Sequence, residues 1–190
     1  MSTEMVALNL GAGQYAQPIE EACIKFGIVT PLQKAHFLAQ IGHESGGFRV
    51  VRESLNYSVD GLMKTFGRHR ISAEDCQKYG RTAGRAANQT AIANAVYGGE
   101  WGRKNLGNTQ PGDGSRFIGR GLKQLTGRAN YYAYSMAMYG DDRIVQNPVL
   151  LERAPDVAWS AGWFWQRNNL NAFADRDDIE GLTRRVNGGL

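Results

Sequence analysis

The fold is decided by residues 30–48, whose sequence is TPLQKAHFLAQIGHESGGF. Thr30-Pro31 has the form of an N-cap followed by the first residue of a helix. Apolar and small residues then recur at helical spacing in two neighbouring rows, Leu32-Ala35-Leu38-Ala39-Gly42 and Phe37-Ile41-Glu44. The glycines at 46 and 47 can adopt positive φ and so end a helix. The stretch therefore predicts a helix whose last turn carries Glu44.

Glu44 would be partly dehydrated at this place, between apolar neighbours and a tight turn. Desolvation disfavours the charged form of a carboxyl, and a carboxylic acid that keeps its proton near neutral pH can act as a general acid. A surface glutamate before a glycine cap is the simpler interpretation of this stretch alone. Glu53, nine residues further on and beyond the glycine break, supplies a second carboxylate. Two carboxylates across a groove, one protonated and one ionised, are the minimum equipment for hydrolysing a glycosidic bond.

Length and composition indicate one globular domain, predicted as a single catalytic domain over residues 1–190 with a possible small lobe at about 45–115. Hydrophobic residues make up 42% of the chain without any long apolar run, which argues against a membrane-spanning protein. No Lys or Arg precedes Lys25, so we expect no signal peptide. Cys23 and Cys76 fit neither metal-ligand spacing nor a disulfide scaffold, which predicts buried free thiols and no metal or cofactor.

The formal net charge of +4 favours an anionic partner, either nucleic acid or an acidic polymer such as a cell wall. The run Arg68-His69-Arg70 could contact phosphate, although a solvated charged face is the commoner meaning of such runs. No recognition-helix or single-strand-binding signature accompanies it, which argues against a nucleic-acid-binding protein. A metalloprotease is excluded because Gly47 stands where the His-Glu-x-x-His motif requires its second histidine.

Helical patterns and caps predict further helices at residues 18–26, 58–66, 86–97, 148–154, 155–165 and 178–186. The helix at 155–165 is apolar on most faces and should be the central buried one. Residues 98–121 contain eight glycines and predict a long loop that forms a binding rim. Residues 126–132 combine aromatics with an amide beside a glycine turn, which suits either a sugar ring or core packing. The predicted class is mainly α, with little or no β-sheet.

Four motifs occur in this order along the chain: HESGGF (43–48), ESLNYS (53–58), FIGRGLKQLTGRANY (117–131) and VNGG (186–189). In this combination, from about residue 20 to the end, the chain resembles the family-19 glycoside hydrolases, the group of plant-type chitinases and many bacteriophage endolysins. The resemblance implies a lysozyme-like helical domain of two lobes with a groove between them. It also implies an inverting mechanism, in which the two carboxyl groups stand roughly 6.5–9.5 Å apart to admit a water.

Carried over residue by residue, the resemblance makes Glu44 the general acid, Glu53 the general base, and Ser58 a residue that helps to hold the attacking water. It implies substrate contacts at five further positions, which are His43, Gln124, Thr126, Asn130 and Asn187. Structural alternatives exist for three of these residues: Ser58 as a helix cap, Thr126 as part of a turn, and His43 as the donor to a backbone carbonyl.

The leading hypothesis is an endolysin-type enzyme that cleaves the N-acetylhexosamine backbone of peptidoglycan and lyses a host bacterium. Such an enzyme would be a monomer, made in the host cytoplasm and acting on the wall after membrane permeabilisation, without membrane insertion or nucleic-acid partners. A chitinase using the same two glutamates is the close rival, and a lytic transglycosylase, which needs only one catalytic glutamate, is another. The non-enzyme alternative is a catalytically dead cell-wall-binding module.

Overall fold

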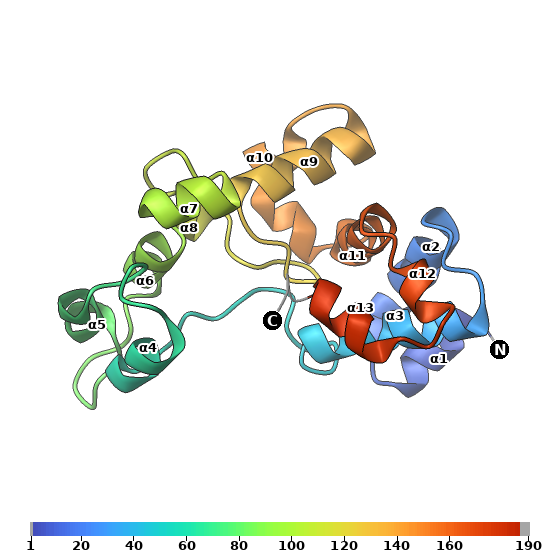
Figure 1. Ribbon diagram of the computed structural model, residues 1–190, viewed down its shortest axis with the longest axis horizontal. Coiled ribbons are helices and arrows are strands. Elements are labelled where there is room, and N and C mark those ends of the chain that lie inside the picture. Colours follow the sequence, from blue (N-terminus) through green and yellow to red (C-terminus); the bar gives the residue numbers. More distant parts are fainter. Residues whose placement is uncertain (1, 187–190) are drawn as a thin grey trace. The chain divides into compact units, whose positions relative to one another are not determined.

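The computed structural model describes residues 2–186 and is built almost entirely of helices (Figure 1). Within these residues, β-structure is limited to two isolated bridges, Ser58 with Arg81 and Thr82 with Arg85. The predicted mainly α class is therefore confirmed. The chain divides into two compact units, one formed by the described residues up to Val51, Arg120–Gln124 and those from Val149 onward, and the other by Arg52–Gly119 and Leu125–Pro148.

The first unit contains α1 (Thr3–Asn9), η1 (Gly13–Tyr15), α2 (Ala16–Lys25), α3 (Pro31–Glu44), η2 (Pro148–Glu152, at its boundary), α11 (Asp156–Arg167), α12 (Asn171–Ala174) and α13 (Ile179–Val186). The second unit contains α4 (Val59–Thr65), α5 (Ala73–Tyr79), α6 (Gln89–Val96), α7 (Gly99–Leu106), α8 (Asp113–Arg116), α9 (Arg128–Tyr139) and α10 (Arg143–Gln146).

Helix α3 begins and ends where the sequence predicts. The Thr30 side chain accepts from the Gln33 N–H and the Gln33 side chain accepts from the Thr30 N–H, a complete capping box ahead of Pro31. In the first row of α3, Leu32, Ala35 and Ala39 are exposed and Leu38 is buried. Phe37 and Ile41 of the second row are buried, and the Phe37 ring meets Trp165 edge to face at 5.3 Å.

Helix α11 is the central helix of the first unit, as predicted. Eight of its residues are buried, among them Val157, Ala161 and Trp165. The ring of Phe26, the residue that caps the C-terminal end of α2, lies so close to Gly162 that an added Cβ could not fit. Cys23 on α2 and Cys76 on α5 are both buried free thiols, as expected.

The second unit is built around a core formed by Leu55, Leu62, Phe66, Ile71, Cys76, Ile92, Ala93, Val96 and Ile118. The prediction of one long loop at residues 98–121 was wrong, because this stretch contains α7 and α8. Its glycines serve close packing: a Cβ on Gly114 would lie 2.7 Å from the Asn94 Cα of α6. Helix α5, within the weakly patterned residues 67–85, and helix α9, at 128–139, were also missed.

In the basic run before α5, Arg68 and His69 are exposed, and the two arginines also donate to backbone carbonyls. Arg68 donates to the carbonyls of Leu62, Met63 and Phe66 and so satisfies the C-terminal end of α4. Arg70 donates from Nε to the Val96 carbonyl at 2.9 Å. Both arginines are therefore structural.

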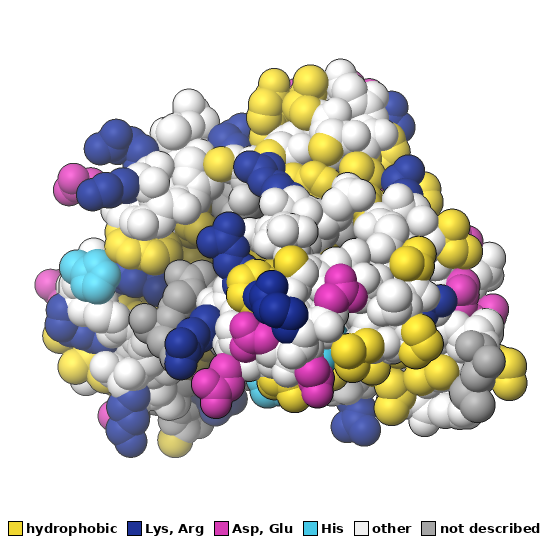
Figure 2. All heavy atoms as spheres, turned by 45° about the vertical axis from the view of Figure 1, so that its right-hand side comes forward, with side chains coloured by type: hydrophobic (Ala, Val, Ile, Leu, Met, Phe, Trp, Pro, Cys, Tyr) yellow, Lys and Arg dark blue, Asp and Glu magenta, His cyan; other side chains and the backbone are white. Residues whose placement is uncertain are grey.

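No helix in the described part of the chain is long and apolar enough to cross a membrane. Figure 2 shows one face of the molecule, on which Lys and Arg side chains are dispersed among acidic and hydrophobic ones. On this face the positive charge does not gather into a single basic field.

Candidate active site

Glu44 is the last residue of α3, and Gly46 and Gly47 follow it with φ of 58° and 74°. Its side chain is 17% exposed, which agrees with the partial dehydration expected from the sequence. The Lys123 ammonium lies 3.3 Å from Glu44 Oε2 and 4.8 Å from the centre of the Phe164 ring. Glu44 therefore sits in an ion pair that the aromatic ring of α11 helps to cover.

Lys123 is positioned by the short segment Arg120–Gln124. The Gly121 N–H donates to the Val51 carbonyl and the Leu122 N–H donates to the Val157 carbonyl, each at 2.9 Å. Arg120 pairs with Glu152 at 2.7 Å, with its own side chain only 6% exposed. Because both backbone and side-chain bonds fix this segment in the first unit, the ammonium beside Glu44 has a rigid support.

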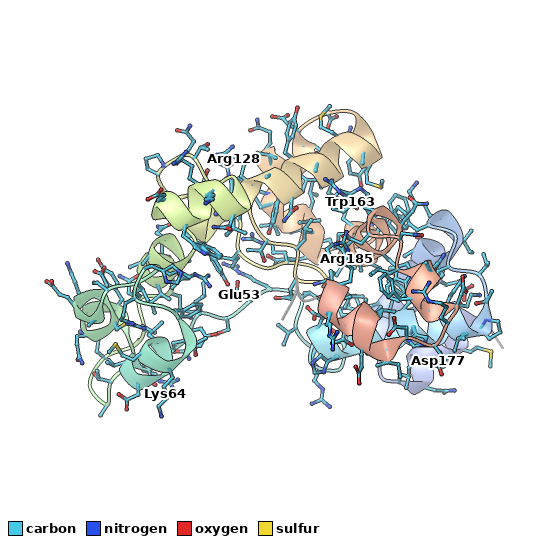
Figure 3. All side chains as sticks on the ribbon, in the orientation of Figure 1. Glu53, Lys64, Arg128, Trp163, Asp177 and Arg185 are labelled. Carbon is cyan, nitrogen blue, oxygen red and sulfur yellow. The ribbon has the colours of Figure 1, made fainter. Side chains whose placement is uncertain are left out.

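Glu53 lies in the second unit, on the irregular chain between α3 and α4 (Figure 3). The Tyr97 hydroxyl donates to Glu53 Oε1 at 2.5 Å and the Gly119 N–H donates to Oε2 at 3.1 Å. The Glu53 N–H in turn donates to the Gly119 carbonyl at 2.8 Å. Both carboxylate oxygens and the backbone of this residue are thus held by defined donors and acceptors.

Tyr97 is itself held in place at the end of α6. The Asn108 side chain donates to the Tyr97 carbonyl and accepts from the Arg128 N–H, each at 2.8 Å. The Arg70 guanidinium lies 5.4 Å from the Tyr97 ring and 3.8 Å from the Trp101 ring. Burial, and then the negative charge of Glu53, raise the pKa of Tyr97 far above its usual value, so its phenol remains a donor.

A pocket of about 410 Å³ opens beside Glu53 within the second unit. Its polar lining comes from Glu53, Gln89, Thr90 and Ser115, and Ile118 contributes apolar surface. The size and mixed lining suit a small polar ligand such as a sugar ring. One carboxylate with two fixed donors at the wall of such a pocket can accept a proton from a bound water.

Comparison with known proteins agrees with this arrangement. No protein-family model matches the chain. A curated protein of Haemophilus influenzae, described as a glycosyl hydrolase family 19 domain-containing protein, is 37% identical over 174 residues, which cover 92% of this chain and 80% of the relative. The chain belongs to glycoside hydrolase family 19. It is accordingly a glycoside hydrolase, as the sequence predicted.

Solved structures of this family support the fold. Chitinase C from Streptomyces griseus aligns with a TM-score of 0.51 at 22% identity, over 90% of this chain and 70% of the chitinase. A mutant of chitinase C aligns with a TM-score of 0.50 at 20% identity, over the same shares of the two chains. These likenesses confirm the helical, lysozyme-like fold of the family 19 enzyme.

The other predicted site residues of this family 19 chain fall in both units. In the first, His43 is exposed, and the Gln124 side chain donates to the Gly121 carbonyl at 2.9 Å. In the second, Asn130 is exposed in the first turn of α9 and donates to the Thr126 carbonyl at 2.9 Å. Asn187 lies outside the described residues.

Ser58 has a clear structural task in this enzyme. Its hydroxyl accepts from the Gly61 N–H at 3.0 Å and caps α4, as the structural alternative proposed. Within residues 2–186 the Ser58 side chain makes no hydrogen bond to Glu53. The hydroxyl that caps α4 is the same one that the resemblance assigns to holding the attacking water.

Tyr97 and Lys123 were missed by the sequence reasoning, although each contacts a predicted catalytic carboxylate of the family 19 enzyme. Lys123 belongs to the motif of residues 117–131, and its place in that motif, between Gly121 and Gln124, could have marked it as a candidate site residue. Tyr97 carries no such signal, because it ends an alanine-rich helix and 44 residues separate it from Glu53.

The tyrosines of the motif around Asn130 have a structural role. Tyr131 is fully buried, donates to the Ile118 carbonyl at 2.5 Å and packs on Phe117 at 5.1 Å. Of the two open interpretations of residues 126–132, core packing therefore holds for Tyr131, whereas Tyr132 is half exposed. Among the residues that the structure describes, no three His, Cys, Asp or Glu side chains gather as a metal site.

Proposed function

We propose that this family 19 enzyme hydrolyses the N-acetylhexosamine backbone of bacterial peptidoglycan with inversion at the anomeric carbon. The observation that carries the proposal is the environment of Glu53, whose carboxylate accepts from Tyr97 and Gly119 at the wall of a pocket. Donors to both oxygens fix the orientation of the carboxylate towards a water bound in the pocket, from which a general base takes a proton.

In the proposed reaction Glu44 gives its proton to the glycosidic oxygen that leaves. A water attacks the anomeric carbon from the opposite face, and Glu53 takes the proton that this water loses. One proton thus leaves Glu44 and one arrives at Glu53, and proton exchange with solvent restores both groups. Ser58 would act through its cap on α4, which keeps the chain after Glu53 in place.

The covalent chain supports joint action of the two glutamates. Glu53 contacts Gly119 and Glu44 contacts Lys123, and these two partners are four residues apart in the motif of residues 117–131. Each carboxylate thus has a partner within one motif of the sequence, which supports the proposal that both belong to one function. We propose that Gln124 and Asn130, which belong to the same motif, contact the glycan, together with His43, Thr126 and Asn187.

Peptidoglycan is proposed over chitin because the chain carries a net positive charge of +4 and peptidoglycan is anionic. The wider role that we propose is that of an endolysin, with lysis of a host bacterium from within. Chitin hydrolysis is the second candidate, and the observation that favours it is the likeness to chitinase C.

Product analysis tests the reaction. Mass spectrometry of fragments released from purified peptidoglycan should show a reducing hexosamine end and no anhydro end, and NMR of the first product should show an inverted anomer. Glu44→Gln and Glu53→Gln should each lower the rate at least ~100-fold. The matched control is Glu74→Gln, an exposed residue of α5, which should keep full activity.

The alternatives give different outcomes. Anhydro ends together with activity in Glu53→Gln would mean a single-glutamate transglycosylase. Retention at the anomeric carbon would overturn the role of Glu53 as a base. Cleavage of neutral N-acetylglucosamine oligomers without cleavage of peptidoglycan would establish the chitinase instead, and binding without any cleavage would establish a wall-binding module.

A further inference from the structure

A second pocket, of about 590 Å³, lies in the first unit and is lined by aromatic and basic side chains. Phe164 of α11, Phe173 of α12, and Arg184 and Arg185 of α13 form its wall, and Asn168 adds an amide. The volume is in the range of small-molecule sites. No contact already described for Glu53 involves this pocket, which lies in the other unit.

This pocket adjoins Glu44. Lys123 approaches the Glu44 carboxylate at 3.3 Å and the Phe164 ring at 4.8 Å, and Phe164 forms part of the pocket wall. A single ammonium thus connects the predicted catalytic acid with the second pocket. A saccharide unit next to the bond that Glu44 protonates would therefore lie within reach of the pocket.

Among the described residues that line the pocket, two are arginines and none is acidic. Arg184 is 3.7 Å from Glu180 one turn earlier, and Lys123 is paired with Glu44. Arg185 is exposed and has no acidic partner among the residues that the structure describes, although it lines the pocket. Arg176 and Asp178, at 4.0 Å, balance each other nearby. Arg185 is thus the guanidinium left to bind an external anion.

Aromatic faces and a guanidinium together match one chemistry. The rings of Phe164 and Phe173 can cover the C–H face of a sugar, and a planar guanidinium binds a carboxylate through paired N–H donors. We propose that this pocket binds a hexosamine unit that carries a carboxylate, and that Arg185 is the residue that recognises the carboxylate. The proposal rests on the proposed function of Glu44 and names the class of its substrate as an anionic glycan.

Binding measurements separate this proposal from the proposed function. Glu53→Gln protein, which should bind without cleaving, is titrated calorimetrically with three tetrasaccharides of equal length. The first is neutral and consists of N-acetylglucosamine, the second alternates N-acetylglucosamine with N-acetylmuramic acid, and the third adds stem peptides to the second. Arg185→Gln is compared with Arg153→Gln, which removes the same charge from an exposed position of the same unit that does not line the pocket.

Arg185→Gln should weaken binding of the muramic acid tetrasaccharide about 5-fold, the scale of one partly exposed charge pair. Added salt should reduce this difference. Affinity for the neutral tetrasaccharide should change less than 2-fold, and Arg153→Gln should match the parent on all three ligands. The stem peptide is joined through an amide to the muramic acid carboxylate, so the third ligand carries its free carboxylates on the peptide alone. A loss with the second ligand and not with the third would therefore assign the recognised carboxylate to the sugar, and a loss confined to the third ligand would assign it to the stem peptide.

Equal affinities of Arg185→Gln and Arg153→Gln for both anionic ligands would overturn the inference. So would an equal loss on the neutral ligand, because Arg185 would then contact any sugar. Neither result touches the proposed hydrolysis, which is judged by product analysis of the unmodified enzyme. Conversely, failure of the enzyme to cleave peptidoglycan would reject the proposed function, while the binding data would still decide whether the pocket selects anions.

Discussion

Tyr97→Phe is the most informative single change in the proposed site. It deletes the hydroxyl that donates to Glu53 Oε1 at 2.5 Å and keeps the ring against which Arg70 packs at 5.4 Å. The Gly119 N–H continues to donate to Oε2 at 3.1 Å. The variant therefore removes one of two donors from the carboxylate without emptying the space beneath it.

The size of the effect follows from the bond that is lost. A hydrogen bond to a charged group contributes about 1.5–3 kcal/mol. Water can replace part of it because Glu53 lines an open pocket, so we expect the lower end of that range. Since 1.36 kcal/mol corresponds to a factor of ten in rate, kcat/KM should fall by about 10-fold. Looser placement of the base should lower kcat by about 10-fold with little change in KM.

The assay is the rate of glycan hydrolysis, measured as new reducing ends over a range of substrate concentrations. Tyr79→Phe serves as the control, because Tyr79 is a partly buried tyrosine that packs against the core of the same unit. Thermal unfolding of each variant shows whether the fold is intact. A kcat of Tyr97→Phe equal to that of the parent enzyme would refute the assigned role of Tyr97.

Two further predictions concern stability. Gly121→Ala should lower the free energy of unfolding, measured by urea titration, by about 2–4 kcal/mol. The reason is that the φ of Gly121 is +75° and the new Cβ would lie 2.7 Å from Ser160 Oγ. Gly84→Ala is the control and should lower it much less, because a Cβ added at Gly84 meets nothing within 4 Å. Burial raises the pKa of Cys23 from 9.0 to about 12, so the folded state keeps a proton that the unfolded state loses. The contribution of the protonated Cys23 thiol to the free energy of unfolding is complete below pH 9. It is lost as the pH rises towards 12, by up to about 4 kcal/mol. In Cys23→Ala the free energy of unfolding should therefore fall less steeply over this pH range.

Local signals in the sequence were enough to place helix α3 and Glu44. The capping box at Thr30 and Gln33 and the glycines after Glu44 act within a few residues, so pattern and structure agree there. The sequence of α3 itself does not show which of its two rows is buried. Both rows have helical spacing, and the choice depends on Trp165, which packs on Phe37 from α11.

Glycine content misled the prediction for residues 98–121. Many glycines usually indicate a loop, but here some of them allow close helix packing. A Cβ on Gly102 would collide with the Tyr97 carbonyl, and one on Gly114 would collide with α6. The space that a glycine leaves is filled by a residue elsewhere in the fold, so composition alone cannot distinguish the two uses.

The partners of the candidate carboxylates could not be predicted for a related reason. Tyr97 is 44 residues from Glu53, and Lys123 is 79 residues from Glu44. Neither contact produces a periodic pattern, whereas the glutamates themselves stand out through their motifs. The sequence therefore predicts the candidate catalytic carboxylates, and the structure adds the side chains that contact them.

Lys123 provides a test of the role of Glu44. Its ammonium lies 3.3 Å from Glu44 Oε2 and holds the side chain in one orientation. Lys123→Met keeps much of the aliphatic stem over Phe164 and removes the charge. Looser placement of Glu44 should then lower kcat by about 10-fold with little change in KM.

The two substitutions together test both carboxylates through their own partners. Tyr97→Phe removes a donor from Glu53, and Lys123→Met removes the cation beside Glu44. Each should lower kcat, because each loosens one of the two groups that the proposed reaction needs. Arg153→Gln, a charge loss in the same unit as Lys123, should leave kcat unchanged. A variant with Lys123→Met that keeps the parent kcat would contradict the proposed part of Glu44 in the reaction.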